Sequence, residues 1–214
     1  IKRLETSSAR YLQRPDISSI NFDTTATALN GLGASVKTGK WSKGHWRYNE
    51  ELVYRSPGLE LNDLGYMNLS DLMKNSTEIS YVEKENTRVF KSYEISLSQQ
   101  NAWNARGGSL YSEISLDAES EFMNGWESGL NSGFRFRNTD KWILRGGPSM
   151  KVPDMLEYSF WFHTNSSKKL FFLLEGNSDQ GLEGNYSLYR ISSELSYRPW
   201  PNLVLSLEPS YERT

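Results

Sequence analysis

The chain has 214 residues, a net charge of −2, no cysteine, and 37% hydrophobic and 13% aromatic residues. Its mean hydropathy of −0.63 and the lack of any apolar run of about eighteen residues exclude helical membrane spans. Without cysteine there are no disulfides or thiolate metal sites, and the scattered charges of both signs argue against a nucleic-acid partner. A chain of this composition can still cross a membrane as a β-barrel, because only every second residue of a barrel strand faces lipid.

The first strand candidates along the chain are irregular. Residues 31–38 are small and polar, and residues 45–55 alternate but place Glu50 on the apolar side. That apolar side consists of Trp46, Tyr48, Leu52 and Tyr54. Residues 69–74 are expected to form a short helical turn.

The clearest pattern lies in residues 126–137, which alternate strictly with period two. The even positions are Trp126, Ser128, Leu130, Ser132, Phe134 and Phe136. The odd positions are Glu127, Gly129, Asn131, Gly133, Arg135 and Arg137. Successive side chains of a strand point to opposite faces, so this segment predicts a strand with one apolar and one polar face.

The same alternation recurs in residues 89–99, 110–118, 189–198 and 203–213, and in a noisier form in residues 155–164. The run Leu170 to Leu174 is apolar on both faces, which is typical of contact with a plug or a second protein, or of a sandwich-core strand.

Turn residues separate these segments in two lengths. Compact turns are expected at 138–140, 165–169 and 199–202, and longer connections at 57–68, 146–154 and 178–185. Short turns alternating with long loops are typical of outer-membrane barrels. Roughly ten to twelve strands of about nine to twelve residues result, near the length that a tilted strand needs to cross a membrane.

The predicted fold class is therefore all-β, an antiparallel transmembrane β-barrel that occupies residues 1–214 as part of a larger barrel in a longer chain. A soluble β-sandwich or propeller shows similar periodicity and is the alternative. If the apolar faces contact lipid, ten charged side chains are expected to line the lumen: Arg47, Arg55, Glu94, Glu113, Arg135, Arg137, Glu157, Arg190, Glu194 and Glu208.

No catalytic or metal-binding pattern stands out. His45 and His163 are the two histidines, and neither has the spacing of a zinc site. His163 could pair with a serine in a lipase-like barrel, but a histidine near a strand end is the simpler interpretation. We therefore expect no enzyme activity, no cofactor and no metal.

The stretch from Tyr54 to Tyr66, Tyr-Arg-Ser-Pro-Gly-Leu-Glu-Leu-Asn-Asp-Leu-Gly-Tyr, is the most distinctive in the chain. Together with residues 39–46 and 144–148, it resembles the carboxy-terminal barrel domain, of unassigned function, of Bacteroidetes-type outer-membrane proteins. In those proteins a family 9 carbohydrate-binding-like module precedes the barrel. The resemblance implies a bacterial outer-membrane location and a link to glycans, but it transfers no catalytic residue. Asn62, Asp63 and Gly65 suit a folded loop that covers the barrel mouth or serves as a structural turn.

Three functions follow as hypotheses. The first is a porin-like, non-enzymatic barrel that admits or handles solutes such as oligosaccharides, with outer-membrane lipid as its surroundings. The second is a structural anchor or docking subunit that binds other envelope proteins. The third is an envelope hydrolase whose active site lies outside this segment.

Overall fold

The computed structural model describes residues 25, 28, 30–59, 61, 69–141, 143–144, 147–184 and 186–214. These residues form β-strands and connections, and no helix among them is long and apolar enough to span a membrane. The strands are β1 (Gly33–Lys40), β2 (Trp46–Arg55), β3 (Leu72–Glu83), β4 (Phe90–Trp103), β5 (Ser109–Phe122), β6 (Glu127–Phe136), β7 (Thr139–Asp140), β8 (Met150–Lys151), β9 (Met155–His163), β10 (Leu170–Gly181), β11 (Ser187–Trp200), β12 (Leu203–Leu207) and β13 (Ser210–Arg213).

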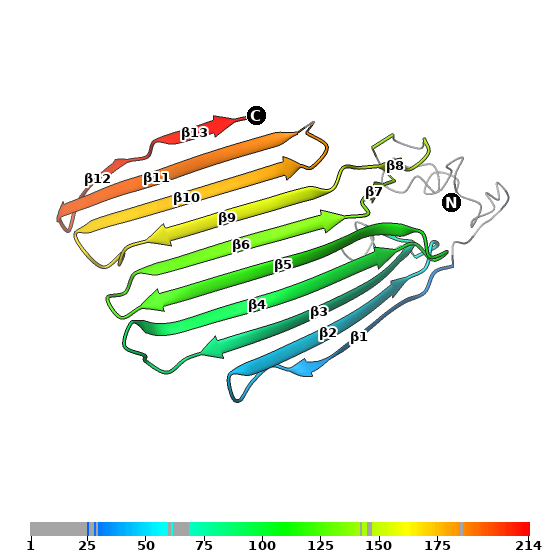
Figure 1. Cartoon of the computed structure of the whole chain (residues 1–214), viewed down its shortest axis with the longest axis horizontal. Helices are drawn as coiled ribbons and strands as arrows, with labels where there is room; N and C mark the ends of the chain where they lie inside the picture. The colour runs from blue at the N-terminus through cyan, green and yellow to red at the C-terminus, as the bar shows by residue number, and fades with distance from the viewer. Residues whose placement is uncertain are drawn as a thin grey trace.

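Eleven strands make one antiparallel sheet in the order β1-β2-β3-β4-β5-β6-β9-β10-β11-β12, and β13 also pairs with β11 (Figure 1). β7 and β8 form a separate small hairpin. The predicted all-β class and the antiparallel arrangement are confirmed. The closed barrel is not: β1 and the β12–β13 edge do not pair with each other, so the described sheet is open.

The two ends of the sheet carry different connections (Figure 1). We name the turn end by its connections 41–45, 84–89, 123–126, 164–169 and 201–202, which have two to six residues. The loop end carries residues 56–71, 104–108, 137–154 and 182–186, of which the first and third are the long ones. The predicted turn near 165–169 and the long connection near 146–154 are therefore at the correct places. Most of the connection predicted at 57–68 lies outside the described residues.

Three local predictions are wrong. Residues 69–74 form no helical turn, because β3 begins at Leu72 and pairs with β2 and β4. Residues 138–140 are not a compact turn but lie in the long connection that contains β7. Residues 178–181 belong to β10, where polar side chains are held by pairing with β9 on one side and β11 on the other.

The register gives the sheet two chemically different faces. Leu130 of β6 pairs with Ala118 of β5 and Phe160 of β9, while the next residue, Asn131, pairs with Asp117 and Ser159. Because paired residues point to the same side, the first row defines an apolar face and the second a polar face, and both continue across the sheet.

Candidate functional site

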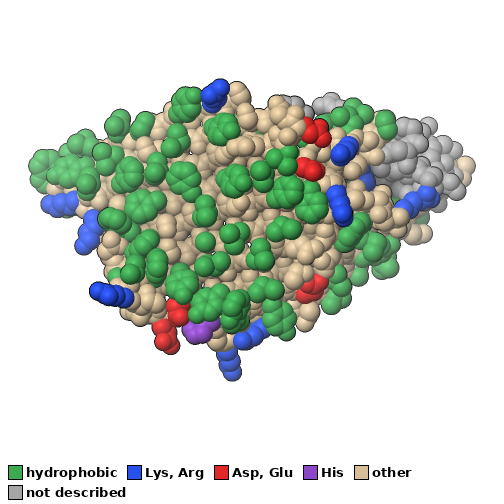
Figure 2. All heavy atoms as spheres, viewed as in Figure 1, with side chains coloured by type: hydrophobic (Ala, Val, Ile, Leu, Met, Phe, Trp, Pro, Cys, Tyr) green, Lys and Arg blue, Asp and Glu red, His purple; other side chains and the backbone are tan. Residues whose placement is uncertain are grey.

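Many large hydrophobic side chains of the apolar face are exposed. Figure 2 shows hydrophobic side chains across the face that Figure 1 also presents. Leu97 is 53% exposed, Leu130 49% and Leu195 44%. Further exposed members are Val36, Trp46, Tyr48, Leu52, Met73, Ile79, Ile95, Ile114, Leu116, Tyr158, Phe160, Leu170, Tyr189, Ile191, Tyr197, Leu205, Leu207 and Tyr211.

The polar face is the more buried of the two over the middle of the sheet. Along β4, Ile95, Leu97 and Gln99 are exposed, whereas the alternating polar-face residues from Ser92 to Gln100 are half-buried. Ser80 and Ser196 on the polar face are buried, with 4% and 5% exposure. A water-soluble sandwich buries its apolar face instead, so this sheet has the opposite arrangement.

Three predicted lumen residues meet in the polar face. Arg135 of β6 donates a hydrogen bond through Nε to Glu113 Oε2 of β5 at 2.8 Å, and its Nη1 lies 3.7 Å from Glu157 Oε1 of β9. Its guanidinium carbon lies 5.9 Å from the centre of the Tyr111 ring. Because the opposing charges come from three neighbouring strands, this half-buried cluster ties β5, β6 and β9 together.

Five other predicted lumen residues also lie on the polar face but in separate places. Arg190 pairs with Glu212 of β13 at 2.7 Å, and Glu194 accepts a hydrogen bond from Ser196. Arg55 donates to the Leu69 carbonyl. The remaining two members are Arg47, whose buried Nε has no hydrogen-bond partner, and Glu94.

Two predicted lumen residues lie outside the strands. Arg137 follows the last residue of β6 and has a φ of 53°. Its backbone N–H donates a hydrogen bond to Asp154 Oδ1 at 3.1 Å. Glu208 lies in the break between β12 and β13 and is exposed. β12 and β13 keep one register with β11, since Ser206 pairs with Ser196 and Ser210 with Ser192, so Glu208 has the same alternation position as these polar-face serines.

The polar face is acidic near the turn end. A cavity of about 240 Å³ there is lined by Glu94, Glu119, Glu121 and Glu127, with the Trp161 ring at its wall. Of these four glutamates, only Glu94 was among the predicted lumen residues. The other three also alternate with apolar residues and could have been found by the same rule. Lys91 reaches Glu121 from the neighbouring strand at 2.6 Å.

A buried ion pair joins the connections at the loop end. Lys141 Nζ lies 3.0 Å from Asp71 Oδ2, and the two residues are 5% and 8% exposed. The other carboxylate oxygen of Asp71 accepts a hydrogen bond from the Ala105 amide at 2.9 Å. Asp71 therefore fastens three connections together, and sequence analysis could not find this contact because its partners are 70 residues apart.

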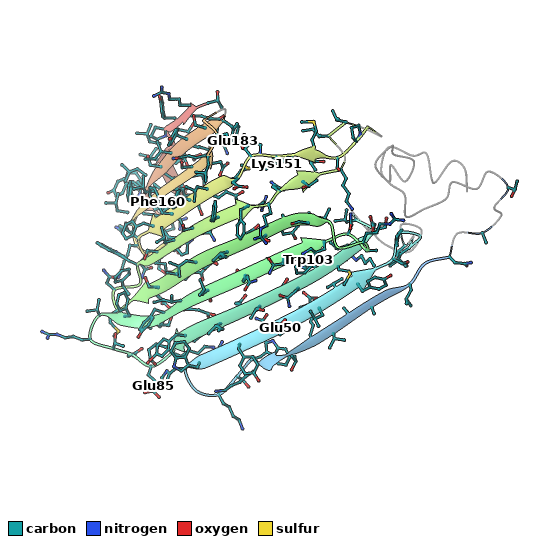
Figure 3. The ribbon with its side chains drawn as sticks, turned by 45° about the vertical axis from the view of Figure 1, so that its right-hand side comes forward. Glu50, Glu85, Trp103, Lys151, Phe160 and Glu183 are labelled. Carbon is teal, nitrogen blue, oxygen red and sulfur yellow. The ribbon has the colours of Figure 1, made fainter. Side chains whose placement is uncertain are left out.

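One group of polar side chains interrupts the apolar face in β2, β3 and β4. We call Glu50, Asn75, Thr77, Gln99 and Asn101 the polar patch; their register places them in two adjacent rows of that face. The side chains of Asn75 and Thr77 each donate a hydrogen bond to the Glu50 carboxylate. Figure 3 shows Glu50 on β2, well away from the strand ends.

Each histidine lies beside an aromatic ring and a glutamate. His163 stacks on Trp161, with ring centroids 5.2 Å apart, and its Nε2 lies 3.5 Å from Glu127. His45 stacks on Tyr81 and lies 3.3 Å from Glu83. No group of three or more metal-ligating side chains occurs within the residues that the structure describes. The predicted loop residues Asn62, Asp63 and Gly65 lie outside those residues.

These features define an all-β protein built on one antiparallel sheet, with an exposed apolar face opposite a charged one. The chain belongs to the DUF5916 family, a domain of unknown function, which matches residues 3–214. No curated protein and no solved structure shows a match to the chain. The family carries no described activity, so the outer-membrane location and the preceding carbohydrate-binding module stay predictions.

Proposed function

We propose that this sheet is part of the wall of an outer-membrane β-barrel that handles polar solutes, with the apolar face toward lipid and the polar face toward an aqueous interior. The observation that carries the proposal is the inverted exposure: large apolar side chains are exposed while the charged face is half-buried. In water this arrangement is unfavourable, and in a bilayer it is the expected one.

Strand length and order support the same proposal. The long strands, β2 to β6 and β9 to β11, have nine to fourteen residues, and about nine to eleven residues suffice for a tilted strand to cross the hydrocarbon core. β12 and β13 share the edge beside β11, so the sheet has ten strand positions. Because neighbouring strands are antiparallel, the two edge strands of these ten positions also run in opposite directions. They could therefore pair antiparallel and close a barrel, either with each other or through further strands between them.

The polar face suits an interior that accommodates solutes of either sign. The Glu113–Arg135–Glu157 cluster and the Arg190–Glu212 pair place both charges on it. Such a wall orients polar solutes without strongly selecting one ion sign. Bilayer recordings of the intact protein should then show conductance with weak selectivity, shifted toward cations by Arg135→Glu. A folded, inserted protein without conductance would favour the anchor or docking hypothesis.

The orientation of the two faces can be tested by single-cysteine labelling, because the chain has no cysteine of its own. Leu130→Cys and Asn131→Cys are adjacent in β6 but point to opposite faces. In liposomes, we expect an environment-sensitive dye at 130 to be quenched by nitroxide lipids and a dye at 131 to be quenched by aqueous iodide. Leu116→Cys and Asp117→Cys on β5 are the matched pair. Iodide quenching at both 130 and 116 would reject the proposal.

A further inference from the structure

Contact with lipid does not explain why the apolar face contains the polar patch. Glu50 is the fifth of the ten residues of β2 and is half-buried on the apolar face. If the face contacts lipid, as proposed above, this position lies near the middle of the membrane. Ionisable side chains at that depth are costly and usually face protein or water, where a partner group satisfies them.

The patch is also organised rather than accidental. Both Glu50 carboxylate oxygens accept hydrogen bonds from β3, one from the Asn75 amide and one from the Thr77 hydroxyl. Gln99 and Asn101 carry the polar surface onto β4. These neighbours contribute hydrogen-bond donors but no positive charge, and no lysine or arginine pairs with Glu50 among the residues that the structure describes.

From this geometry we infer that the polar patch is the docking site of a second membrane protein, which places a lysine or arginine side chain against Glu50. The carboxylate supplies the charge complementarity, and Leu52, exposed beside it on the same strand, supplies apolar contact. A symmetric contact with a second copy would bring two Glu50 carboxylates together, which disfavours that occupant. Cationic lipid headgroups lie at the membrane surface, too far from the middle of β2.

The test is site-specific photocrosslinking of the intact protein in its own membrane, with p-benzoylphenylalanine introduced at Leu52 or, as the control, at Leu130. These side chains are 51% and 49% exposed on the same face, so neither replacement is confined by packing. We expect Leu52 to give a discrete adduct with another protein, whose crosslinked peptide contains lysine or arginine. Leu130 should give lipid adducts alone.

The role of the carboxylate is tested in the same assay. Glu50→Gln should lower the Leu52 adduct roughly threefold to twentyfold, the range expected for a polar contact within a membrane. The matched Glu85→Gln, in the exposed 84–89 turn, should leave it unchanged. Once the partner is known, exchanging its basic residue for glutamate should restore the adduct with Glu50→Lys.

Each other outcome has a defined meaning. Lipid adducts alone at Leu52, an adduct with a second copy or within the same polypeptide, or a yield insensitive to Glu50→Gln would overturn the inference. Lipid adducts at Leu130 would still support the membrane orientation in all three cases. Their absence in folded protein would instead reject the proposed function.

Discussion

The two halves of the apolar face are built differently. From β5 to β12, the side chains on the apolar face are apolar, small or uncharged, and the Phe160 ring lies over Gly176. On the opposite, polar face of the same strands, the Trp161 ring lies over Gly129 in the same way. From β2 to β4, the same face contains the polar patch, held by hydrogen bonds to Glu50. Period-two alternation therefore predicts which side of a strand is apolar, but not what that side contacts.

The largest expected difference comes from adding a positive charge to each half. In reconstituted protein, Leu130→Arg should cost about 2–4 kcal/mol, because it places a guanidinium in the hydrocarbon. Leu52→Arg should cost clearly less, because Glu50 lies two residues away on the same face and can pair with it. Denaturant unfolding from lipid vesicles measures both. The saving at 52 should disappear when Glu50→Gln is added; equal costs at 52 and 130 would remove the distinction between the halves.

A smaller change in unfolding free energy is expected where an aromatic ring packs over a glycine that is replaced by alanine. A Cβ at position 129 would lie 2.2 Å from the Trp161 Nε1 atom, so the ring must move. Gly129→Ala should therefore cost about 1–3 kcal/mol. At Gly133 in the same strand the nearest atom, Glu157 Cβ, is 3.8 Å away. Gly133→Ala should be neutral or stabilise by up to about 1 kcal/mol, and similar losses at both positions would contradict this account.

The smallest effect should come from single hydrogen bonds in the two halves. Thr77→Val removes one donor to the half-buried Glu50 and should cost about 0.5–1.5 kcal/mol. On the apolar face of the other half, Ser120 and Ser128 form a hydrogen bond of 2.9 Å with each other. Replacing both by alanine leaves no unpaired group and should be nearly neutral. Denaturant unfolding curves of the two variants measure both costs. A larger loss of stability in the Ser120→Ala, Ser128→Ala variant than in Thr77→Val would contradict the expectation that the polar patch depends more on its hydrogen bonds.

The sequence predicted the strands whose two faces differ in polarity. β4, β5, β6, β9 and β11 were found because apolar and polar residues alternate along them. β3 was missed because residues 74–78, Lys-Asn-Ser-Thr-Glu, are polar on both faces. A helical turn was expected over residues 69–74, but β3 begins at Leu72. Leu72 packs in a buried cluster with Ala102, and Met73 points to the opposite face of the strand.

The candidate site was predictable only where it follows strand alternation. Eight of the ten proposed lumen residues lie within strands on the polar face. Arg137 lies beyond the end of β6, and Glu208 lies in the gap between β12 and β13, at the same alternation position as Ser206 and Ser210. Glu50 interrupted an otherwise apolar side, but its significance depends on Asn75 and Thr77, which only the register of β2 with β3 brings beside it. Contacts between distant connections, such as Asp71 with Lys141, leave no local signal in a sequence.

The simple order of the large sheet also bears on how it folds. Each strand up to β12 pairs with the strands next to it in the order of the sheet, and the connections between them have two to eighteen residues. Such a meander closes only short loops, whose entropy cost grows slowly with length, so hairpins can be added one after another from either side. Asp71 and Lys141 are different, since they meet only after β3, β4, β5 and β6 lie in place. Their buried pair is therefore expected to form late, after assembly of the middle of the sheet has fixed the loop end.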